Sequence, residues 1–377
     1  MPKVVRTSPF VKFTGKKSMK VEEKILLKGN IAIAKAAVEA GCNCYFGYPI
    51  TPQSEIGEYL SKAMIEANRV FIPVESELAA INMVIGAGST GTKAMTSSSS
   101  CGIALMQEAI SAMSCQQIPG VIISVMRGGP GLGNIAPSQG DYNQACYGGG
   151  NGDYKVIVLS PSTIQESIDL TYLSFHLAFK YRCPVILLAD GILGQMMEPC
   201  SIGEYPYKNY DYDIEKWALD GAKNREPRNL VSLHMNLGEL EKLNYELNNK
   251  FLKIKKNETR FEKYLTEDAN VIITAFGTVA RVAKTAVKQA REMGIKVGLF
   301  RPITLSPFPS DELYNSLNPS TKVVLDVEMN LGQMLKDIRS SVFGKCDVKF
   351  MGKPGGGVIN NDEILEKIIE LNKNLES

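Results

Sequence analysis

The sequence predicts an α/β protein with two doubly wound units, each built on a parallel sheet, joined by a connector. From about Leu26 onward, apolar β-rich runs alternate with stretches of helical periodicity. The runs are apolar almost throughout, which is typical of parallel strands covered by helices on both faces. The alternation stops between about Ser201 and Asp268 and then resumes. The length of 377 residues allows two or three such units.

The first unit contains six candidate strands with helices between them. We expect strands at Cys44–Ile50, Val70–Val74, Lys93–Ser97, Val121–Met126, Lys155–Leu159 and Pro184–Ala189. We expect helices at Thr51–Glu66, Glu77–Gly86, Gly102–Met113 and Ile164–Lys180. Several of them open with Thr, Ser or Pro, which are common at helix N-termini.

The connector is richer in aromatic and charged residues than either unit, and a mixed-charge helix is expected from Leu237 to about Tyr264. The smaller second unit has expected strands at Asn270–Phe276, Lys296–Phe300, Lys322–Val327 and Asp347–Phe350, and helices at Val279–Met293 and Met334–Val342. The chain thus divides into a basic tail (1–24), a first α/β unit (25–200), a connector with a helical arm (201–267) and a second α/β unit (268–377).

The composition is that of an ordinary globular protein, with 44% hydrophobic and 22% charged residues. The 42 basic and 40 acidic residues nearly cancel, so no overall field favours nucleic acid or an anionic membrane surface. No apolar run reaches the roughly 18 residues that a membrane span requires. Residues 1–21 carry six basic residues and no acid, a pattern that basic tails share with organellar transit peptides. We favour a tail and a cytoplasmic location, with organellar import as the open alternative.

Cysteine and histidine usage excludes several kinds of site. The eight cysteines form no Cys-x-x-Cys pair, so a zinc ribbon or an iron–sulfur cluster held by this chain alone is not expected. His176 and His234 are the only histidines, which leaves little material for a hydrolase triad or a multi-histidine metal site. His176 lies in an apolar helical stretch and is expected to be packed.

The segment Gly47–Glu55 (GYPITPQSE) stands where a strand ends and a helix begins, the position at which open α/β sheets bind ligands. Two prolines stiffen this turn, and Thr51 would present its hydroxyl at the crevice. The structural alternative, which spacing alone favours, is that Thr51 caps the helix and Glu55 completes a variant capping box.

Two carboxylates, Glu75 and Glu77, stand at a second junction between a strand and a helix. Acids at a helix start interact favourably with the helix dipole, so a structural role is the default for each of them. A catalytic role for one of them needs independent support.

Two further segments carry small and polar residues. Thr96–Gly102 (TSSSSCG) clusters hydroxyls and a glycine that suit close approach by an anion or a ring. Met126–Gly133 (MRGGPGLG) has Arg127 at a strand end, followed by a glycine-rich loop. That loop is neither a Walker A sequence nor a dinucleotide fingerprint, so alone it is weak evidence.

Taken together and in order, these segments resemble the α subunit of the 2-oxoacid:ferredoxin oxidoreductases. The matching segments are Gly29–Ala37, Gly47–Glu55, Glu75–Met83, Thr96–Glu108, Met126–Gly133, Pro137–Tyr142, Leu188–Pro199 and Phe300–Pro309. They cover nearly the whole chain after residue 28. Cys101 departs from the resemblance, because a proline is common at that point.

The resemblance implies a thiamine pyrimidine-binding domain followed by a smaller transketolase C-terminal-like domain. It also implies a heteromeric complex in which a β subunit shares the thiamine diphosphate. Mg²⁺ and iron–sulfur clusters would belong to partners, among them a γ subunit and a ferredoxin-like δ subunit or domain. Such an enzyme (EC 1.2.7 type) converts a 2-oxoacid and coenzyme A to acyl-CoA and CO₂, with electrons passed to ferredoxin.

The motif match also implies residue roles. Glu77 would contact N1′ of the thiamine aminopyrimidine and promote loss of the C2 proton. Thr51 and Arg127 would contact the substrate carboxylate, which a guanidinium can bind with two charge-assisted bonds. The implied cofactor contacts are Tyr48, Pro49, Ile50, Glu77, Ser100 and Gly102, and no metal ligand is expected.

The subfamily is indicated by Phe46, Gly148–Tyr154 and Thr259–Ala269, which look like the branched-chain group, specific for 2-oxoisovalerate (3-methyl-2-oxobutanoate). A 2-oxoglutarate enzyme needs a second cation for the distal carboxylate, and the sequence identifies none. Two alternatives stay open: a 2-oxoglutarate:ferredoxin oxidoreductase α subunit and a non-catalytic scaffold subunit. The joint presence of Glu77, Thr51 and Arg127 argues against the scaffold.

Overall fold

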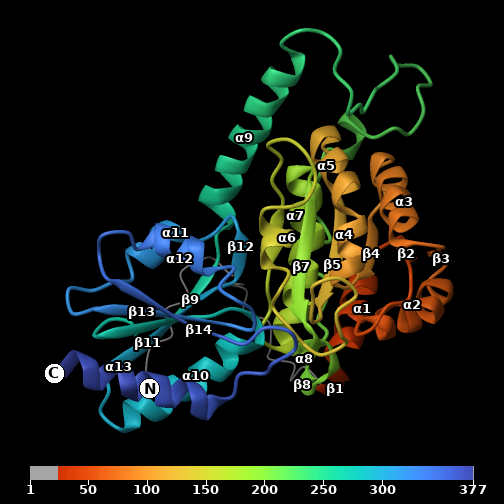
Figure 1. Cartoon of the computed structure of the whole chain (residues 1–377). Coiled ribbons are helices and arrows are strands. Elements are labelled where there is room, and N and C mark those ends of the chain that lie inside the picture. The colour runs from red at the N-terminus through yellow and green to blue at the C-terminus, as the bar shows by residue number, and fades with distance from the viewer. Residues whose placement is uncertain (1–23, 377) are drawn as a thin grey trace, which may run out of the picture.

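The computed structural model describes residues 24–376 and contains two α/β units (Figure 1). The first unit comprises β1 (Ile25–Lys28), α1 (Gly29–Glu39), β2 (Cys44–Gly47), α2 (Ser54–Glu66), β3 (Val70–Pro73), α3 (Glu77–Ser89), β4 (Ala94–Ser98), α4 (Ser100–Leu105), α5 (Gln107–Gln116), β5 (Gly120–Met126), α6 (Tyr142–Cys146), β6 (Ile157–Leu159), α7 (Ile164–Tyr181), β7 (Pro184–Asp190), α8 (Gly191–Gln195) and β8 (Met197–Cys200). Apart from Lys24, the predicted basic tail lies outside the described residues.

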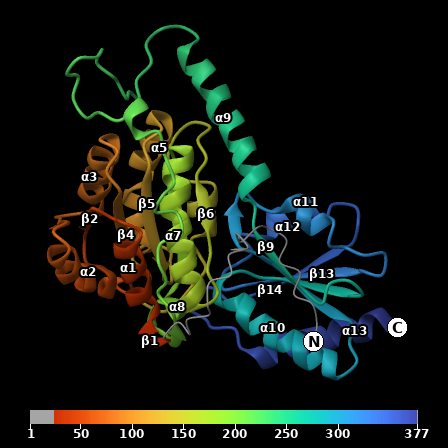
Figure 2. The ribbon, with the colours of Figure 1, turned by 180° about the vertical axis from the view of Figure 1, so that it is seen from behind.

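The connector holds a short 3-10 helix, η1 (Ile214–Lys216), and the long helix α9 (Glu239–Glu258). The second unit comprises β9 (Phe261–Tyr264), β10 (Val271–Thr274), α10 (Gly277–Glu292), β11 (Val297–Pro302), β12 (Thr304–Ser306), α11 (Ser310–Tyr314), β13 (Val323–Glu328), α12 (Leu335–Ser341), β14 (Asp347–Gly352) and α13 (Asn361–Glu376). In both views the N-terminal end of α9 projects beyond the two units (Figures 1 and 2), while Phe251 and Ile254 in its C-terminal half pack against the first core. Among residues 24–376, no helix combines the length and hydrophobicity needed to span a bilayer.

Two main sheets confirm the predicted α/β fold. The first has the order β12-β6-β7-β5-β4-β2-β3, and β2 to β7 pair in parallel. The second has the order β14-β13-β10-β11-β9, with only β9 antiparallel. A separate ribbon pairs β1 with β8. Strand β12 comes from the second unit but forms an edge of the first sheet, where it pairs antiparallel with β6.

Strand β5 shows why a central strand is apolar almost throughout. Successive side chains of a strand point to opposite faces of the sheet. Val121, Ile123 and Val125 join the core formed with α1, α2 and α7. Ile122 and Met126 join the opposite core, formed with α3, α4 and α5. Both faces are therefore buried, as expected for a parallel sheet between helical layers.

The second of these cores continues into the second unit. Phe276, Phe300 and Met334 belong to the same buried cluster as the side chains beneath α3 to α5. A third cluster, between α10, α13 and the opposite face of the second sheet, completes that unit. The two units thus share apolar packing.

Buried polar contacts complete the joint between the units. Asp190, the last residue of β7, accepts hydrogen bonds at Oδ2 from Thr278 N (3.0 Å) and Thr278 Oγ1 (2.7 Å), and at Oδ1 from Leu193 N (3.1 Å). Gln139 Nε2 donates to Phe276 O at 2.8 Å. Through Thr278 and Phe276, these bonds hold the start of α10 against the end of β7 and the loop after β5.

A buried ion pair lies at the same joint. Arg301, 2% exposed, donates from Nη1 to Glu166 Oε2 and from Nη2 to Glu166 Oε1, both at 2.7 Å. Its Nε lies 3.0 Å from Glu262 Oε2. Burial raises the pKa of Glu166, but the charge and hydrogen bonds of Arg301 outweigh burial and lower that pKa to about 2.

Two predicted helices differ from the observed ones. The helix expected from Leu237 to about Tyr264 ends at Glu258, because Phe261–Tyr264 pairs with β11 as strand β9. Phe261 also stacks on Phe300, so this strand depends on tertiary contacts. The helix expected at Gly102–Met113 is divided at Met106 into α4 and α5. The division of the chain at residues 200 and 268 stays a prediction.

The aromatic connector packs on α7. Tyr207 stacks on His176 with ring centroids 3.9 Å apart, and Tyr210 meets the same ring edge-on. The ring Nδ1 of His176 lies 3.2 Å from the Tyr212 hydroxyl. Burial, assisted by the charge of Lys180, lowers the pKa of His176 to about 4. His176 is therefore packed, as the sequence predicts, and its low pKa keeps it neutral near pH 7.

We expect Glu166→Gln to lower the free energy of unfolding by about 3 kcal/mol at neutral pH, because Arg301 loses its two-point partner while staying buried. Since the folded pKa of Glu166 is about 2 and the unfolded value is about 4.3, the wild-type advantage is present above about pH 4. It is lost as the pH falls toward 2. Urea unfolding at several pH values measures both effects.

The control is Glu204→Gln, because Glu204 is exposed and pairs with Lys208 at the surface. That variant should stay within about 0.5 kcal/mol of wild type. Equal losses in the two variants would contradict a special role for the buried pair.

Candidate functional site

Two side-chain amides hold the turn between β2 and α2. Asn30 Nδ2 and Gln195 Nε2 both donate to Pro52 O, at 2.7 and 3.0 Å. The same amides donate to Glu55 Oε2, at 2.8 and 3.1 Å. The turn that carries Thr51 is thereby fixed to the start of α1 and the end of α8.

The capping hypothesis for Thr51 is wrong. Helix α2 begins at Ser54, its N-cap is Gln53, and no side chain caps it. The carboxylate of Glu55 is already engaged by Asn30 and Gln195. Thr51 is exposed, and its carbonyl accepts a hydrogen bond from Arg127 Nη1 at 2.9 Å.

A buried chain of polar groups supports the same turn from below. The hydroxyls of Tyr45 and Ser97 lie 2.7 Å apart, and Ser97 Oγ donates to Gln53 Oε1 at 2.6 Å. Gln53 Nε2 then donates to Tyr48 O at 3.2 Å. Strand β4 thus holds the backbone at Tyr48, where the predicted cofactor contacts Tyr48, Pro49 and Ile50 begin.

The two glutamates at the start of α3 have different surroundings. Ser76 caps this helix by accepting from Ala79 N at 3.3 Å, and Glu75 before it is exposed. Glu77 is only 5% exposed, and its Oε1 accepts from Ser98 Oγ at 3.2 Å. Within residues 24–376, no group donates a hydrogen bond to the other carboxylate oxygen, Oε2. That oxygen can therefore accept from a ligand.

Gly102 in α4 lies directly against Glu77. A Cβ at this position would overlap Glu77 Oε1 and Ser98 Oγ. The absence of a side chain at Gly102 lets the Glu77 carboxylate and the Ser98 hydroxyl pack closely against α4. The approach of an anion or a ring to Thr96–Gly102 stays a prediction.

Arg127 follows β5 directly and is 9% exposed. Its Nη1 donates to Thr51 O, and its Nη2 donates to Leu132 O (3.0 Å) and to Cys101 Sγ (3.2 Å). A guanidinium has five N–H donors, so one at Nη1 and the one at Nε remain. Nε is buried without a partner among the described residues. The guanidinium is thus held by the turn of Thr51 and by the glycine-rich loop.

Ser100 connects Arg127 to an acid that the sequence did not single out. Arg127 N donates to Ser100 Oγ at 3.0 Å, and Ser100 Oγ lies 2.5 Å from Asp141 Oδ2. Burial raises the pKa of Asp141 to about 6, against the lowering effects of the Ser100 hydrogen bond and the Arg127 charge. The sequence pointed to Asp141 only through its place in Pro137–Tyr142, one of the segments that resemble the family.

The predicted site residues therefore form two groups joined by α4. One group contains Glu77 with Gly102, and the other contains Thr51, Arg127 and Ser100. No cluster of three or more metal-binding side chains occurs within residues 24–376.

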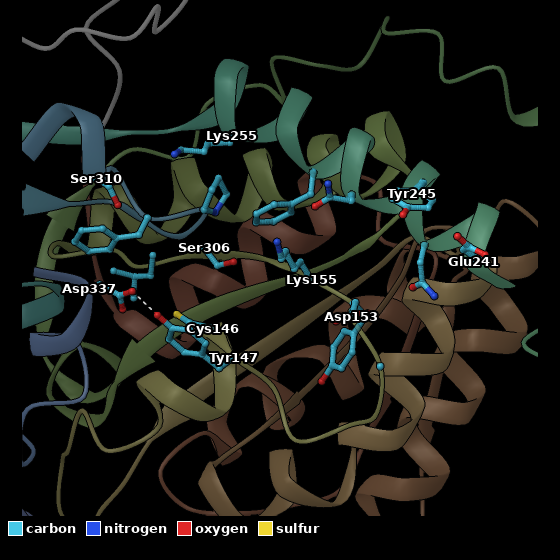
Figure 3. Close-up of a pocket in the computed structure, with 18 residues that line it drawn as sticks. Cys146, Tyr147, Asp153, Lys155, Glu241, Tyr245, Lys255, Ser306, Ser310 and Asp337 are labelled. Atoms are coloured by element: carbon cyan, nitrogen blue, oxygen red, sulfur yellow. Dashed lines mark hydrogen bonds between the residues drawn. The ribbon is translucent and has the colours of Figure 1, made fainter. Parts of the chain in front are cut away.

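A cavity of about 780 Å³ lies elsewhere, with α9 as one wall (Figure 3). Tyr147, Tyr154, Phe251, Phe308 and Asp337 are among its lining residues. It contains none of the predicted site residues, so size alone does not identify the chemistry. We assign the candidate site from the contacts of Glu77 and Arg127.

Two family models match the chain. The model described as pyruvate flavodoxin/ferredoxin oxidoreductase, thiamine diphosphate-binding, matches residues 35–264. The model described as pyruvate:ferredoxin oxidoreductase core domain II matches residues 269–364.

Known relatives align over most of the chain. The ketoisovalerate oxidoreductase subunit VorB of Methanothermobacter thermautotrophicus is 48% identical, over 92% of this chain and 97% of the relative. The 2-oxoglutarate synthase subunit KorA of Methanothermobacter marburgensis is 35% identical, over 92% and 99%. The 2-oxoglutarate:ferredoxin oxidoreductase structure from Magnetococcus marinus has a similar fold, with a TM-score of 0.82 and 24% identity. It is matched over 93% of this chain and 65% of that chain.

We expect Gly102→Ala to lower stability by about 1–3 kcal/mol, because the new methyl group must displace Glu77 or Ser98. The matched control is Gly86→Ala in the exposed interior of α3, where a Cβ meets nothing within 4 Å. Alanine there should stabilise the helix by about 0.5–1 kcal/mol. Scanning calorimetry compares them, and a fully stable Gly102→Ala would refute tight packing at the carboxylate.

Proposed function

The chain belongs to the 2-oxoacid:ferredoxin oxidoreductase family, and from this membership we propose that it is the pyrimidine-binding α-type subunit of a complex that oxidises a branched-chain 2-oxoacid. The greater identity to a ketoisovalerate subunit, 48% against 35% for a 2-oxoglutarate subunit, supports the branched-chain class over its alternative. The complex would convert 2-oxoisovalerate and coenzyme A to acyl-CoA and CO₂, and pass electrons to ferredoxin.

The observation that carries the proposal is the buried carboxylate of Glu77. Its Oε1 is held by Ser98 and packs closely against Gly102, and its Oε2 can accept from a ligand. These features fit the aminopyrimidine of thiamine diphosphate, with Glu77 holding the proton at N1′. When bound, the cofactor supplies the carbon nucleophile for the 2-oxo group. Tyr48, Pro49, Ile50 and Ser100 would line the same site.

Arg127 and Thr51 would bind the substrate carboxylate. A two-point grip uses Nη2 together with Nη1 or Nε, and both Nη2 hydrogens are engaged by Leu132 O and Cys101 Sγ. Binding therefore requires Arg127 to release one of them. A thiol is a weak acceptor, so the bond to Cys101 is the easier one to give up.

The divided site implies partners. Large apolar side chains are exposed on α3, on α4 and on the loop after Arg127. They are Leu78, Leu105, Leu132 and Ile135, with exposed fractions between 49% and 79%. Exposed apolar side chains near the site residues in the chain suit a protein interface. A β subunit would hold the diphosphate and Mg²⁺, and γ and δ partners would complete the complex with iron–sulfur clusters.

The cytoplasm is the proposed location. All eight cysteines are free, as thiols remain in a reducing compartment. A non-catalytic scaffold subunit would need neither the buried carboxylate of Glu77 nor the tethered guanidinium of Arg127, so these two groups argue against that alternative.

We expect the isolated chain to be inactive and to bind thiamine diphosphate weakly, because pyrimidine contacts alone offset little of the cost of association. Calorimetric titration of the chain, with and without its co-expressed partners, measures this difference. Tight, Mg²⁺-dependent binding to the chain alone would refute the divided site.

The two glutamates at the start of α3 provide a built-in comparison. Glu77→Gln should lower the rate by about 10² or more, since it keeps the side-chain size but removes the carboxylate at N1′. Glu75→Gln should leave the rate nearly intact and cost about 0.3–1 kcal/mol of stability, because Glu75 is exposed before the helix. Exchange of the thiamine C2 proton in the assembled complex, followed by NMR after acid quench, reads the step directly.

The exchange rates separate the outcomes. If Glu75→Gln is slow and Glu77→Gln is fast, the glutamates are assigned the wrong way round. If both variants exchange at the wild-type rate, neither carboxylate activates the cofactor.

A further inference from the structure

Asp141, Ser100 and Arg127 form a polar relay behind the proposed carboxylate site. Asp141 immediately precedes α6, Ser100 is the first residue of α4, and Arg127 directly follows β5. Ser100 Oγ lies 2.5 Å from Asp141 Oδ2 and accepts from Arg127 N at 3.0 Å. A carboxylate is therefore one hydroxyl away from the arginine.

The ionisation state of Asp141 decides how this relay is oriented. A serine hydroxyl has a single hydrogen. When Asp141 is ionised, that hydrogen goes to Oδ2, and the Ser100 oxygen accepts from Arg127 N. When Asp141 is protonated, it can donate to Ser100, whose hydrogen then turns to Arg127 O, 3.2 Å away. Each state gives the backbone of Arg127 a different set of bonds.

The charge of Asp141 also acts on the guanidinium. Burial raises the pKa of Asp141 to about 6, opposed by the Ser100 hydrogen bond and the Arg127 charge. The groups that act on it within the described chain are thus the Ser100 hydroxyl from α4 and the Arg127 cation from the end of β5. An ionised Asp141 partly neutralises Arg127, and a protonated one leaves its full charge to a ligand.

We propose that Asp141 is a positioning residue that, through Ser100 and Arg127, sets how strongly the enzyme attracts the carboxylate of its 2-oxoacid. The inference rests on the proposed function, in which Arg127 binds that carboxylate. An ionised Asp141 weakens substrate binding, both by offsetting the cation and by repelling the substrate anion. A neutral Asp141 strengthens binding.

The test uses the complex assembled with co-expressed partners and the Michaelis constant for 2-oxoisovalerate, with coenzyme A and a viologen dye, from about pH 5.5 to 8. In wild type the KM should rise about threefold to tenfold as the pH passes through about 6, with a smaller change in kcat. Asp141→Asn should keep a low KM across the range. The control Asp153→Asn, which removes an exposed acid away from Arg127, should keep the wild-type profile.

A second variant keeps the test decisive if Asp141→Asn fails to assemble. Ser100→Ala removes a hydrogen bond that lowers the pKa of Asp141, so the KM step should move to higher pH. A step that stays in place in Ser100→Ala, or persists in Asp141→Asn, would overturn the role of Asp141.

Arg127→Lys separates this inference from the proposed function. Lysine keeps the charge but loses the planar two-point grip, so KM should rise at every pH. If KM rises in Arg127→Lys while Asp141→Asn keeps the wild-type step, the proposed function stands and only the role of Asp141 fails. If Arg127→Lys leaves KM unchanged at every pH, Arg127 does not bind the carboxylate, and both proposals for this site fail.

Discussion

The buried carboxylate of Asp190 fixes two helix starts at once, and much of the candidate site depends on it. Its oxygens accept from Leu193 at the start of α8 and from Thr278 at the start of α10, so both units are tied to the end of β7. Helix α8 ends at Gln195, which holds the carbonyl of Pro52. The residue that ties the two units together therefore also supports the turn that carries the proposed substrate contacts.

The same dependence reaches the acid behind the arginine. Gln139 donates to Phe276 O and accepts from Met329 N at 3.1 Å, so its loop is fastened to the second unit. Asp141 lies two residues further on and bonds Ser100 in the first unit. A shift between the units would move the Asp141 carboxylate relative to Arg127. The smaller unit therefore helps to position the site, although none of its described side chains lies in the site.

The sequence predicts strands such as Val121–Met126 well, because they are buried on both faces and are apolar at nearly every position. It also makes Glu77 and Arg127 candidates for the site, because they lie in segments that resemble a known family. It does not predict β9, because Phe261–Tyr264 is a strand only through pairing with β11. Nor does it reveal that Arg127 is held by backbone carbonyls, or that Asp141 lies behind it, since both depend on contacts between distant segments.

Strand β12 has a consequence for how the protein can be divided. It covers the outer edge of β6, where an open strand would present unpaired amides and carbonyls to other chains. The second unit therefore protects the first against aggregation by covering this edge. Removing the second unit would expose that edge together with the apolar surface that Phe276 and Phe300 now cover. The two units therefore form one folding piece. A protein fragment that contains the first unit alone should be less soluble than the whole chain.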